Sequence, residues 1–325
     1  MKKNLCFILV FCFVIITSFS LYAQDNSKYQ MSLIKKIYSM GTASVNGTYY
    51  PFGNSMARLI GKKLKRIVII AEPTPGSIAN VEYLRKKRID LALIQSDVAW
   101  MAHQGSYNYV GNSLSDLKVL ASLYSEKIQI VVRADSGINT IRDLKGKKIA
   151  IGEKESGSAA GAIQILETAG LKNNTDYELL FERFTKSTES LLDGYIDALY
   201  YVGASPAYGI ERLAERVPIK LIEIPSEVIT KLTSSYPYYC VEKIEKNAYK
   251  GQSKEINTLG FKALLACTNQ LPSDDVFDIL DVLYSNPRIL SEQDREVEIK
   301  KEDALKGLDA SMLHEGAAKY FATQK

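Results

Sequence analysis

The chain has 325 residues, of which 46% are apolar and 24% charged, and its formal net charge is only +4. These fractions are typical of a globular protein, and the length is that of two domains of ordinary size. The basic excess is scattered and forms no block of Lys and Arg with interleaved aromatic residues, which argues against nucleic-acid binding.

The first 23 residues are predicted to be a secretory signal peptide. Lys2 and Lys3 precede a long apolar run, and Asp25 restores polarity. The positive start and the small exit residue indicate cleavage after Ala23, so the mature protein is expected to be exported. The alternative is an uncleaved membrane anchor, because the apolar run is longer than a minimal signal core.

Strands and helices alternate behind this segment. The apolar residues of 52–64 fall on one helical face, and Pro51 suits the first turn of that helix. The predicted elements are a strand at 33–41, a helix at 52–64, a strand at 66–73, a helix at 76–88, a strand at 89–94 and a helix at 95–105.

A second run of elements begins near residue 119. Residues 119–135 have the composition of a strand and are long enough to cross between two lobes. From about Ser226 the chain is predicted to be helical, apart from a strand-like run at 255–267. The elements between are a helical turn and strand in 140–152, a loop and helix in 153–171, a helix and strand in 188–203, a loop and helix in 204–215, and a strand at 218–225.

The two runs repeat each other. Each contains a strand, a loop of small residues and a helix, and later a helix, an Ile-Asp strand, a loop and a helix. Strands that alternate with helices of this length indicate parallel sheets built from βαβ units. Two such lobes predict a ligand cleft between them, because open α/β sheets bind ligands at the carboxyl ends of their strands.

Two loops of small residues are candidate anion sites. A glycine lets the backbone approach a ligand closely, and the amides at the start of a helix are free donors that favour an anion. The alternative is ordinary helix capping. The repetition of the device in two equivalent places favours a ligand with a carboxylate and a second anionic or polar end. The candidate residues are Gly47, Thr48 and Tyr49 in the first loop, and Ser156, Gly157 and Ser158 in the second.

Polar residues also follow the two Ile-Asp strands. Gln95 and Ser96 are candidates for hydrogen bonds to a ligand, although Ser96 is equally suited to capping the next helix. In the second lobe Tyr200 and Gly203 occupy the matching place, and alternation turns one of the tyrosines at 200 and 201 toward a cleft. Tyr offers a small polar ligand both a hydroxyl and an apolar face.

Signals for an enzyme are weak. His103 and His314 stand in no metal-binding motif, and nucleophile-elbow, P-loop and dinucleotide-binding motifs are absent. Asp90 and Asp197 could be an acid–base pair, but each is better explained as fixing the start of its strand. We therefore expect no catalytic residue, no metal and no cofactor.

Cys240 and Cys267 are the two cysteines of the mature chain. An exported pair could form a disulfide, because that compartment is oxidising. The alternative is two buried thiols that behave as small apolar residues. The sequence leaves both open.

The order and spacing of these segments resemble the TAXI family, the substrate-binding receptors of tripartite ATP-independent periplasmic (TRAP) transporters. The resemblance covers nearly the whole mature chain. It rests on "MGTASVNGTYYPFGNSMARLI", "TPGSIANVEYLRKKRIDLALIQSDVAWMAHQG", "LASLYSEKIQIVVRADSGINTIRDLKGKKIAIGEKESGSAAGAIQILETAG", "DGYIDALYYVGASPAYGI", "YPYY" and "HEGAAKYF".

The resemblance implies a type II periplasmic-binding-protein fold of the α/β class, whose lobes close on a small carboxylate. It also implies a ligand such as glutamate or a dicarboxylate, delivered by a monomeric receptor to the membrane permease of a TRAP transporter. The family's ligand loops match the candidate residues above. The chain departs from the family at Val45-Asn46 and at Glu315. We expect a first lobe at 24–125, a second at 126–229, and completion of the first at 230–325.

Two other functions fit a bilobed exported protein. A sensory module would dock on a sensor kinase in its closed form. An exported enzyme would need Cys240 or Asp197 to point into the cleft. In a transport receptor or a sensory module, hinge residues are expected at Leu123–Ile130 and Asn257–Lys262. The ligand would stabilise the closed state because its affinity for that state is greater.

Overall fold

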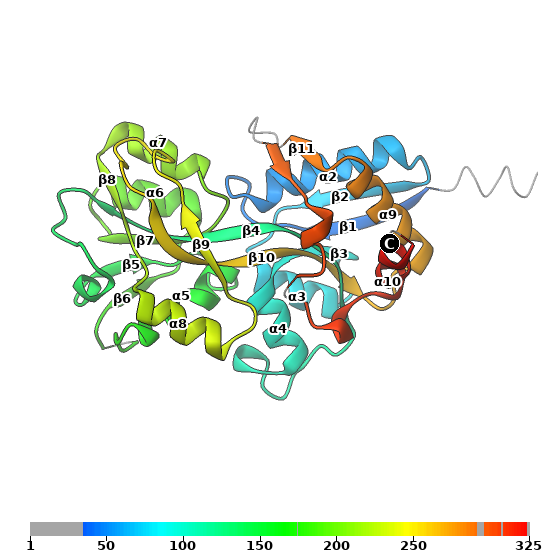
Figure 1. Cartoon of the computed structure of the whole chain (residues 1–325), viewed down its shortest axis with the longest axis horizontal. Helices are drawn as coiled ribbons and strands as arrows, with labels where there is room; N and C mark the ends of the chain where they lie inside the picture. Colours follow the sequence, from blue (N-terminus) through cyan, green and yellow to red (C-terminus); the bar gives the residue numbers. More distant parts are fainter. Residues whose placement is uncertain (1–34, 174, 291–295, 307, 324–325) are drawn as a thin grey trace, which may run out of the picture.

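Two long strands run through the middle of the molecule and connect its two lobes (Figure 1). They are β4 (Leu117–Arg133) and β10 (Ile256–Thr268), which pair antiparallel with each other. The computed structural model describes residues 35–173, 175–290, 296–306 and 308–323, so the predicted signal peptide and its cleavage site lie outside the described residues. The expected crossing strand and the strand-like run at 255–267 are these two strands.

One sheet of ten strands runs through both lobes in the order β2-β1-β3-β10-β4-β7-β5-β6, with β8 also paired to β4 and β9 (Cys240–Ile244) to β10. Its two ends correspond: β2-β1-β3 followed by the antiparallel β10 in the first lobe matches β6-β5-β7 followed by the antiparallel β4 in the second. The strands are β1 (Lys36–Gly41), β2 (Ile67–Glu72), β3 (Leu91–Gln95), β5 (Lys148–Ala150), β6 (Glu178–Leu180), β7 (Ala198–Gly203) and β8 (Ile219–Ile222). The repeat in the sequence is thus a repeat of topology, and the predicted two-lobe α/β fold is confirmed.

Helices cover the sheets of both lobes (Figure 1). Those of the first lobe are α2 (Tyr49–Lys63), α3 (Ser77–Arg85), α4 (Ser96–Gln104), α9 (Ser273–Ser285) and α10 (Glu315–Ala322). Those of the second are α5 (Gly157–Thr168), α6 (Phe184–Leu192), α7 (Tyr208–Arg216) and α8 (Ser226–Ser235). Pro51 lies in the first turn of α2, as predicted. One apolar core packs α2 and α9 against the first sheet, and another surrounds α6 and α7.

The start of β3 and the segment before β7 are fixed by the same device. Asp90 accepts a hydrogen bond from the amide of Ser39 in β1 (2.8 Å), and Asp197 accepts one from the amide of Lys148 in β5 (2.8 Å). Each carboxylate therefore joins two neighbouring strands. This confirms their interpretation as structural residues.

The C-terminal third contains more strands than the sequence predicts. β9 (Cys240–Ile244) pairs antiparallel with the start of β10, and β11 (Arg288–Leu290) pairs with β12 (Glu296–Glu298). These strands are short and lie at sheet edges, so their apolar residues form no long periodic signal. The prediction of an almost wholly helical segment after Ser226 is wrong for this reason.

Both cysteines are free thiols. Cys267 is buried in β10 and Cys240 is half-buried in β9, and burial raises the pKa of both.

Within the described part of the chain no helix is long and apolar enough to cross a membrane. No cluster of three or more potential metal-ligating side chains occurs among the same residues.

Candidate functional site

A cavity of about 80 Å³ lies between the lobes, where the carboxyl ends of the strands of both sheets meet. A single buried water needs about 10–15 Å³, so the cavity has room for a small molecule. Eight of the ten predicted ligand residues line it: Gly47, Thr48, Tyr49, Gln95, Ser156, Gly157, Ser158 and Tyr200.

The first-lobe loop contributes side chains more than amides. The amide of Gly47 donates to the carbonyl of Ser44 (2.9 Å), so the expectation that it serves a ligand directly is not met. Thr48 contacts the second lobe instead: its hydroxyl lies 3.1 Å from the Tyr201 hydroxyl and accepts from the amide of Ala204 (3.1 Å). This loop therefore joins the two lobes just before the first residue of α2.

The second-lobe loop presents the start of α5 to the cavity. Ser156 caps the helix by accepting from the amide of Ala159 (3.2 Å), and Ser158 accepts from the amide of Val202 in β7 (3.2 Å). The amides of Gly157 and Ser158 belong to the first turn and have no carbonyl partner within the helix. With the helix dipole, these amides give this end of the cavity, here named the anion-binding end, an electrostatic preference for an anion.

Gly157 allows a very close approach between the lobes. An added Cβ at Gly157 would lie 2.2 Å from Oε1 of Gln95 and 2.9 Å from the hydroxyl of Ser77. The side-chain amide of Gln95 donates to Asp97 (3.4 Å), which turns its oxygen toward α5. A side chain at this position would force the ends of the Gln95 and Ser77 side chains to move in the closed arrangement.

Two predicted site residues do not line the cavity. The Ser96 hydroxyl donates to the carbonyl of Tyr238 (3.2 Å) and accepts from the amide of Lys262 (3.0 Å), so it ties α4 to β10. Because Gly203 has no side chain, it leaves room for the Tyr201 ring. A Cβ added at Gly203 would lie 2.5 Å from the Tyr201 hydroxyl. Ser96 and Gly203 thus lie outside the lining of this cavity, and their predicted ligand contacts stay predictions.

Aromatic side chains form the second-lobe wall. Tyr200 and Tyr201 both line the cavity, and Tyr201 stacks on Phe184 with ring centroids 4.0 Å apart. Alternation along β7 therefore does not keep one tyrosine away from the site, because the cavity lies around the end of the strand. The buried hydroxyl of Tyr200 has no hydrogen-bond partner among the described residues. It is a polar atom that a ligand could satisfy.

Glu126 is the important site residue that sequence reasoning missed. It lies in β4 at the crossing between the lobes, lines the cavity, and is 2% exposed. The hydroxyl of Tyr49 donates to its carboxylate (2.6 Å). Burial raises its pKa to about 8, and burial raises the pKa of nearby Asp97 to about 7. One signal existed: a glutamate in the middle of a strand otherwise suited to burial.

The lining contains no Lys, Arg or His among the described residues. Arg183 pairs with Glu153 of the cavity (3.2 Å), and Arg133 pairs with Asp135 (3.0 Å).

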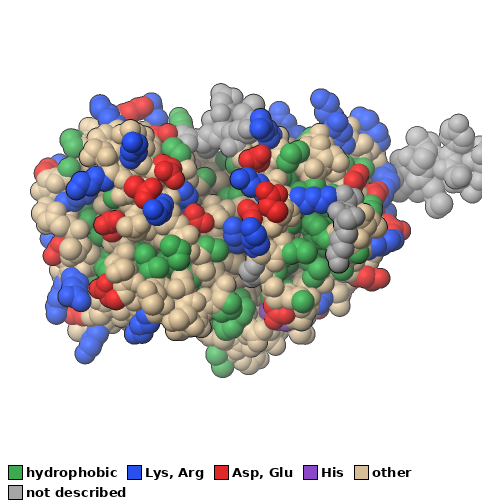
Figure 2. Space-filling model, in the orientation of Figure 1, with side chains coloured by type: hydrophobic (Ala, Val, Ile, Leu, Met, Phe, Trp, Pro, Cys, Tyr) green, Lys and Arg blue, Asp and Glu red, His purple; other side chains and the backbone are tan. Residues whose placement is uncertain are grey.

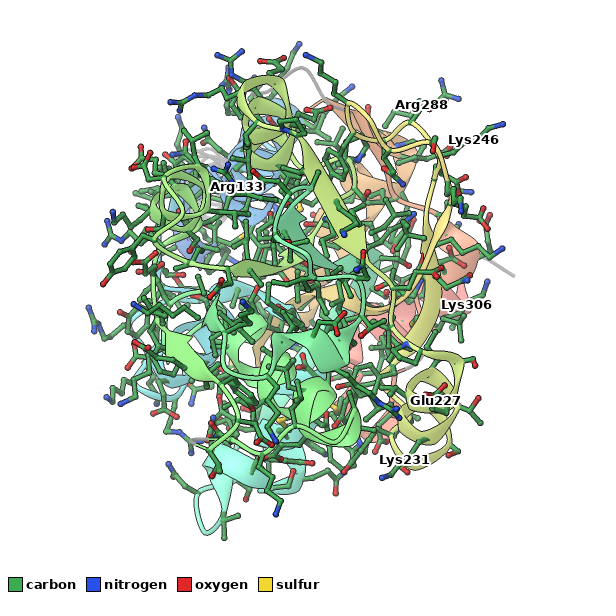
Figure 3. The ribbon with its side chains drawn as sticks, turned by 90° about the vertical axis from the view of Figure 1, so that its left-hand side faces the viewer. Arg133, Glu227, Lys231, Lys246, Arg288 and Lys306 are labelled. Atoms are coloured by element: carbon green, nitrogen blue, oxygen red, sulfur yellow. The ribbon has the colours of Figure 1, made fainter. Side chains whose placement is uncertain are left out.

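Figure 3 shows Lys231 and Lys246 at the outer edge of the molecule, and in Figure 2 acidic and basic side chains are interspersed over both lobes. On the face shown in Figure 2, positive charge is therefore spread out rather than gathered in one patch.

Further contacts hold the lobes together around the cavity. The amide of Ala79 in α3 donates to the carbonyl of Glu155 before α5 (3.1 Å), and the Asn46 side chain donates to Thr185 of α6 (2.7 Å). These bonds join the first lobe to the second on two sides of the cavity. The structure is therefore a closed arrangement of the lobes.

A group of tyrosines around Gln164 adds another bridge between the lobes. Gln164 of α5 donates to the hydroxyl of Tyr107, from the segment after α4 (2.8 Å). Tyr239 donates to its oxygen (2.7 Å), and the Tyr107 and Tyr236 hydroxyls lie 3.0 Å apart. The "YPYY" segment thus contributes to closure from outside the cavity.

Replacing Tyr107 with phenylalanine is expected to weaken ligand binding about 3- to 10-fold, because the closed arrangement loses a hydrogen bond worth roughly 0.5–1.5 kcal/mol. Titration calorimetry on Tyr107→Phe measures the loss. Tyr195→Phe is the matched control, since Tyr195 lies on the surface before β7 and contacts Lys148. Equal affinities of the two variants would contradict a role for this bridge.

A family match covers residues 40–324, a range that includes both lobes and every residue lining the cavity. The chain belongs to the NMT1-like family. The match shows membership of the NMT1-like family, and the resemblance to the TAXI family stays a prediction.

Solved proteins share the fold of this NMT1-like chain. PhnD1 of Prochlorococcus marinus (MIT 9301), in complex with methylphosphonate, is 12% identical with a TM-score of 0.53, over 82% of this chain and 94% of that one. An ABC uptake transporter substrate-binding protein of Streptococcus pneumoniae, with bound histidine, is 17% identical with a TM-score of 0.50, over 80% and 89%. At these identities the likeness establishes the periplasmic-binding-protein fold and leaves the ligand open.

Proposed function

We propose that this protein is a periplasmic receptor that closes its two lobes on a small polar ligand and presents it to a membrane transporter. The observation that carries the proposal is the cavity itself, which is lined from both lobes and enclosed by bonds between them. A ligand held there would add contacts only in the closed arrangement, and so would stabilise it. Cys240 and Asp197, the residues an enzyme on this scaffold would need in the cleft, do not line the cavity.

The ligand is proposed to carry a carboxylate. The amides at the start of α5 supply donors for it, and the unpartnered Tyr200 hydroxyl supplies another. The residues proposed to contact the ligand are Thr48, Tyr49, Gln95, Gly157, Ser158 and Tyr200.

The hinge is proposed to lie where β4 changes partners. Lys127 pairs with Gly260 of β10 on one side and with Gly203 of β7 on the other, and it lies within the expected hinge at Leu123–Ile130. The division into lobes at 24–125, 126–229 and 230–325 belongs to the same proposal. So does a monomeric receptor, because both walls of the cavity come from one chain.

The transporter is proposed to be of the TRAP type, on the sequence resemblance to the TAXI family alone. The S. pneumoniae protein that shares the fold serves an ABC transporter, so the partner needs its own test. A gene for a fused TRAP permease beside this one would support the proposal. A neighbouring ABC permease or sensor kinase gene would favour the corresponding alternative.

Residues 24–325 are expected to melt at a higher temperature in the presence of an amino acid or a small carboxylic acid. A ligand at a hundred times its dissociation constant adds about 2.7 kcal/mol to the free energy of unfolding. A thermal-shift screen of such compounds measures this. A screen without any shift would contradict the proposed function.

A further inference from the structure

We infer that Glu126 selects ligands that bring an ammonium group into the cavity and discriminates against acids that lack one. This inference rests on the proposed receptor function and assigns a role in specificity to a residue of the crossover strand. Its basis is the placement of the Glu126 carboxylate: buried, on the cavity wall, and without a basic partner.

The groups around Glu126 carry no positive charge that could neutralise it. Tyr49 of α2 donates its hydroxyl, Asp97 of α4 adds negative charge, and Tyr124 lies two residues away in the same strand. Tyr201 faces the cavity from β7, and Phe261 is the residue paired with Glu126 in β10. No ion pair joins Glu126 to Lys, Arg or His within the described residues.

The other carboxylate of the cavity differs in this respect. Glu153 already pairs with Arg183 at the surface, whereas Glu126 has one neutral hydrogen bond. A buried carboxylate with no cation is costly to ionise, and its raised pKa of about 8 is the result. A ligand ammonium beside it would supply the missing charge, while a second ligand carboxylate would meet a like charge or require Glu126 to stay protonated.

A second acceptor lies close to the anion-binding end of the cavity. Because the Gln95 side-chain nitrogen donates to Asp97, its oxygen faces Gly157 at the start of α5. The Gln95 oxygen and the amide donors of α5 are therefore adjacent, and Glu126 lines the same cavity. This juxtaposition suits a ligand in which an ammonium and a carboxylate are attached close together, as in an α-amino acid.

The test compares ligands that differ by one charged group. L-Glutamate, glutarate and 4-aminobutyrate form one set, and L-alanine, propionate and ethylamine form a second, smaller set. Dissociation constants are measured by titration calorimetry for the wild type, for Glu126→Gln, and for Glu255→Gln as the matched control at an exposed ion pair with Lys243. Repeating the titrations in two buffers of different ionisation enthalpy measures the protons released.

We expect the wild type and Glu255→Gln to bind an amino acid better than its deaminated partner. Glu126→Gln should lose roughly 30-fold or more in affinity for the amino acid, because the ammonium loses its buried counter-charge. In the wild type, affinity should rise by up to about tenfold per pH unit between pH 6 and 8, since the bound ammonium displaces the proton of Glu126. Glu126→Gln should show neither the rise nor the proton release.

Tyr49→Phe gives a second test that keeps the carboxylate. The Tyr49 hydrogen bond lowers the pKa of Glu126, so its loss should move the rise in affinity to higher pH while the preference for the amine remains. Equal or tighter binding of glutarate or propionate, unchanged by Glu126→Gln, would overturn the inference and leave the receptor function intact. Binding of ethylamine, with no preference for the compounds that also carry a carboxylate, would support Glu126 and contradict the carboxylate site. If no compound of either set binds, the inference and the proposed function both fail.

Discussion

Replacing Gly157 with alanine is expected to weaken ligand binding by about 5-fold to 150-fold without unfolding the protein. The added methyl group would overlap Oε1 and Cδ of Gln95, at 2.2 and 2.4 Å, and would lie 2.9 Å from the Ser77 hydroxyl. Gln95 is buried and held by Asp97, so it has little room to withdraw. Overpacking of this kind costs about 1–3 kcal/mol or more, and here the cost falls on the closed arrangement alone.

The fold should tolerate the change, because Gly157 is the first residue of α5 and alanine favours a helix. Gly61→Ala is the matched control: it also lies in a helix, and its nearest atom would be an ordinary 3.9 Å away. Calorimetry gives the affinities, and small-angle X-ray scattering with and without ligand shows whether the lobes close. Wild-type affinity in Gly157→Ala would mean that the ligand binds with Gln95 and α5 further apart than in this structure.

The architecture could be predicted from the sequence because its signals are local and repeated. Strand composition and length identified β4 as a crossing strand and 255–267 as a strand, and the repeated Ile-Asp strands identified the two lobes. The crossing role of β10 was implied only by the family resemblance. The start of α5 was likewise a local signal, since small residues before an Ala-rich helix mark a helix N-terminus. The structure places these features at the shared cavity, where the chain topology requires them to meet.

The chemistry of the site was less predictable because it depends on contacts between distant residues. Whether the Gly47 amide is available depends on how tightly its own turn folds back onto Ser44. The Ser96 hydroxyl is taken by Tyr238, 142 residues away in the chain. The burial of Glu126 arises only when both lobes and Tyr49 surround it. A sequence pattern contains none of this information about tertiary proximity.

The prediction that both loops bind an anionic group therefore needs revision for the first loop, at 47–49. Two matching helix starts suggested either a dianion or a carboxylate with a second polar end. The second loop has amides without a partner in the helix, because it forms the first turn of α5. The first loop instead contributes the hydroxyl groups of Thr48 and Tyr49, and the Tyr49 hydroxyl donates to the buried carboxylate of Glu126. The two ends of the cavity thus differ in charge preference, which favours a zwitterion over a dianion.

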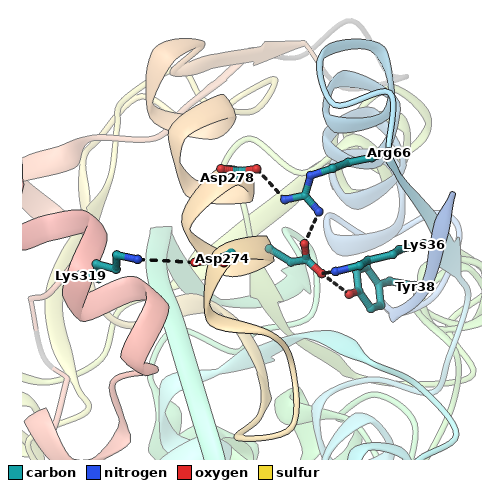
Figure 4. Close-up of polar contacts among 7 residues, drawn as sticks. Lys36, Tyr38, Arg66, Asp274, Asp278 and Lys319 are labelled. Atoms are coloured by element: carbon teal, nitrogen blue, oxygen red, sulfur yellow. Dashed lines mark hydrogen bonds and ion pairs between the residues drawn. The ribbon is translucent and has the colours of Figure 1, made fainter. Parts of the chain in front are cut away.

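A buried ion cluster in the first lobe leads to the largest expected effect on stability (Figure 4). Asp275 of α9 is almost fully buried, and its carboxylate accepts hydrogen bonds from Lys36 (2.7 Å), from the Tyr38 hydroxyl and from Arg66. Arg66 also pairs with Asp278 (2.6 Å). The cluster joins α9 to β1 and to the segment that leads into β2.

Asp275→Asn is expected to lower the free energy of unfolding by about 2–3 kcal/mol, which corresponds to a fall in melting temperature of about 3–5 °C for a chain of this length. Removing one member of a buried ion pair leaves its partners uncompensated; the figure is below that for a fully buried pair because Lys36 and Arg66 are partly exposed. Asp274→Asn is the matched control, since Asp274 is exposed and 3.5 Å from Lys319, and should change stability by less than about 0.5 kcal/mol.

The difference between wild type and Asp275→Asn should depend on pH in one direction. Burial would raise the pKa of Asp275, but the hydrogen bonds from Lys36, Tyr38 and Arg66 outweigh it and hold the pKa below its ordinary value. The ionised carboxylate therefore contributes its full stabilisation above the unfolded-state pKa of about 3.9, and loses it as the pH falls through the lower folded-state value. Melting curves from pH 7 to pH 3 should show the two proteins converging at the acid end. A gap that stays constant over this range would show that Asp275 stabilises the lobe by packing rather than by its charge.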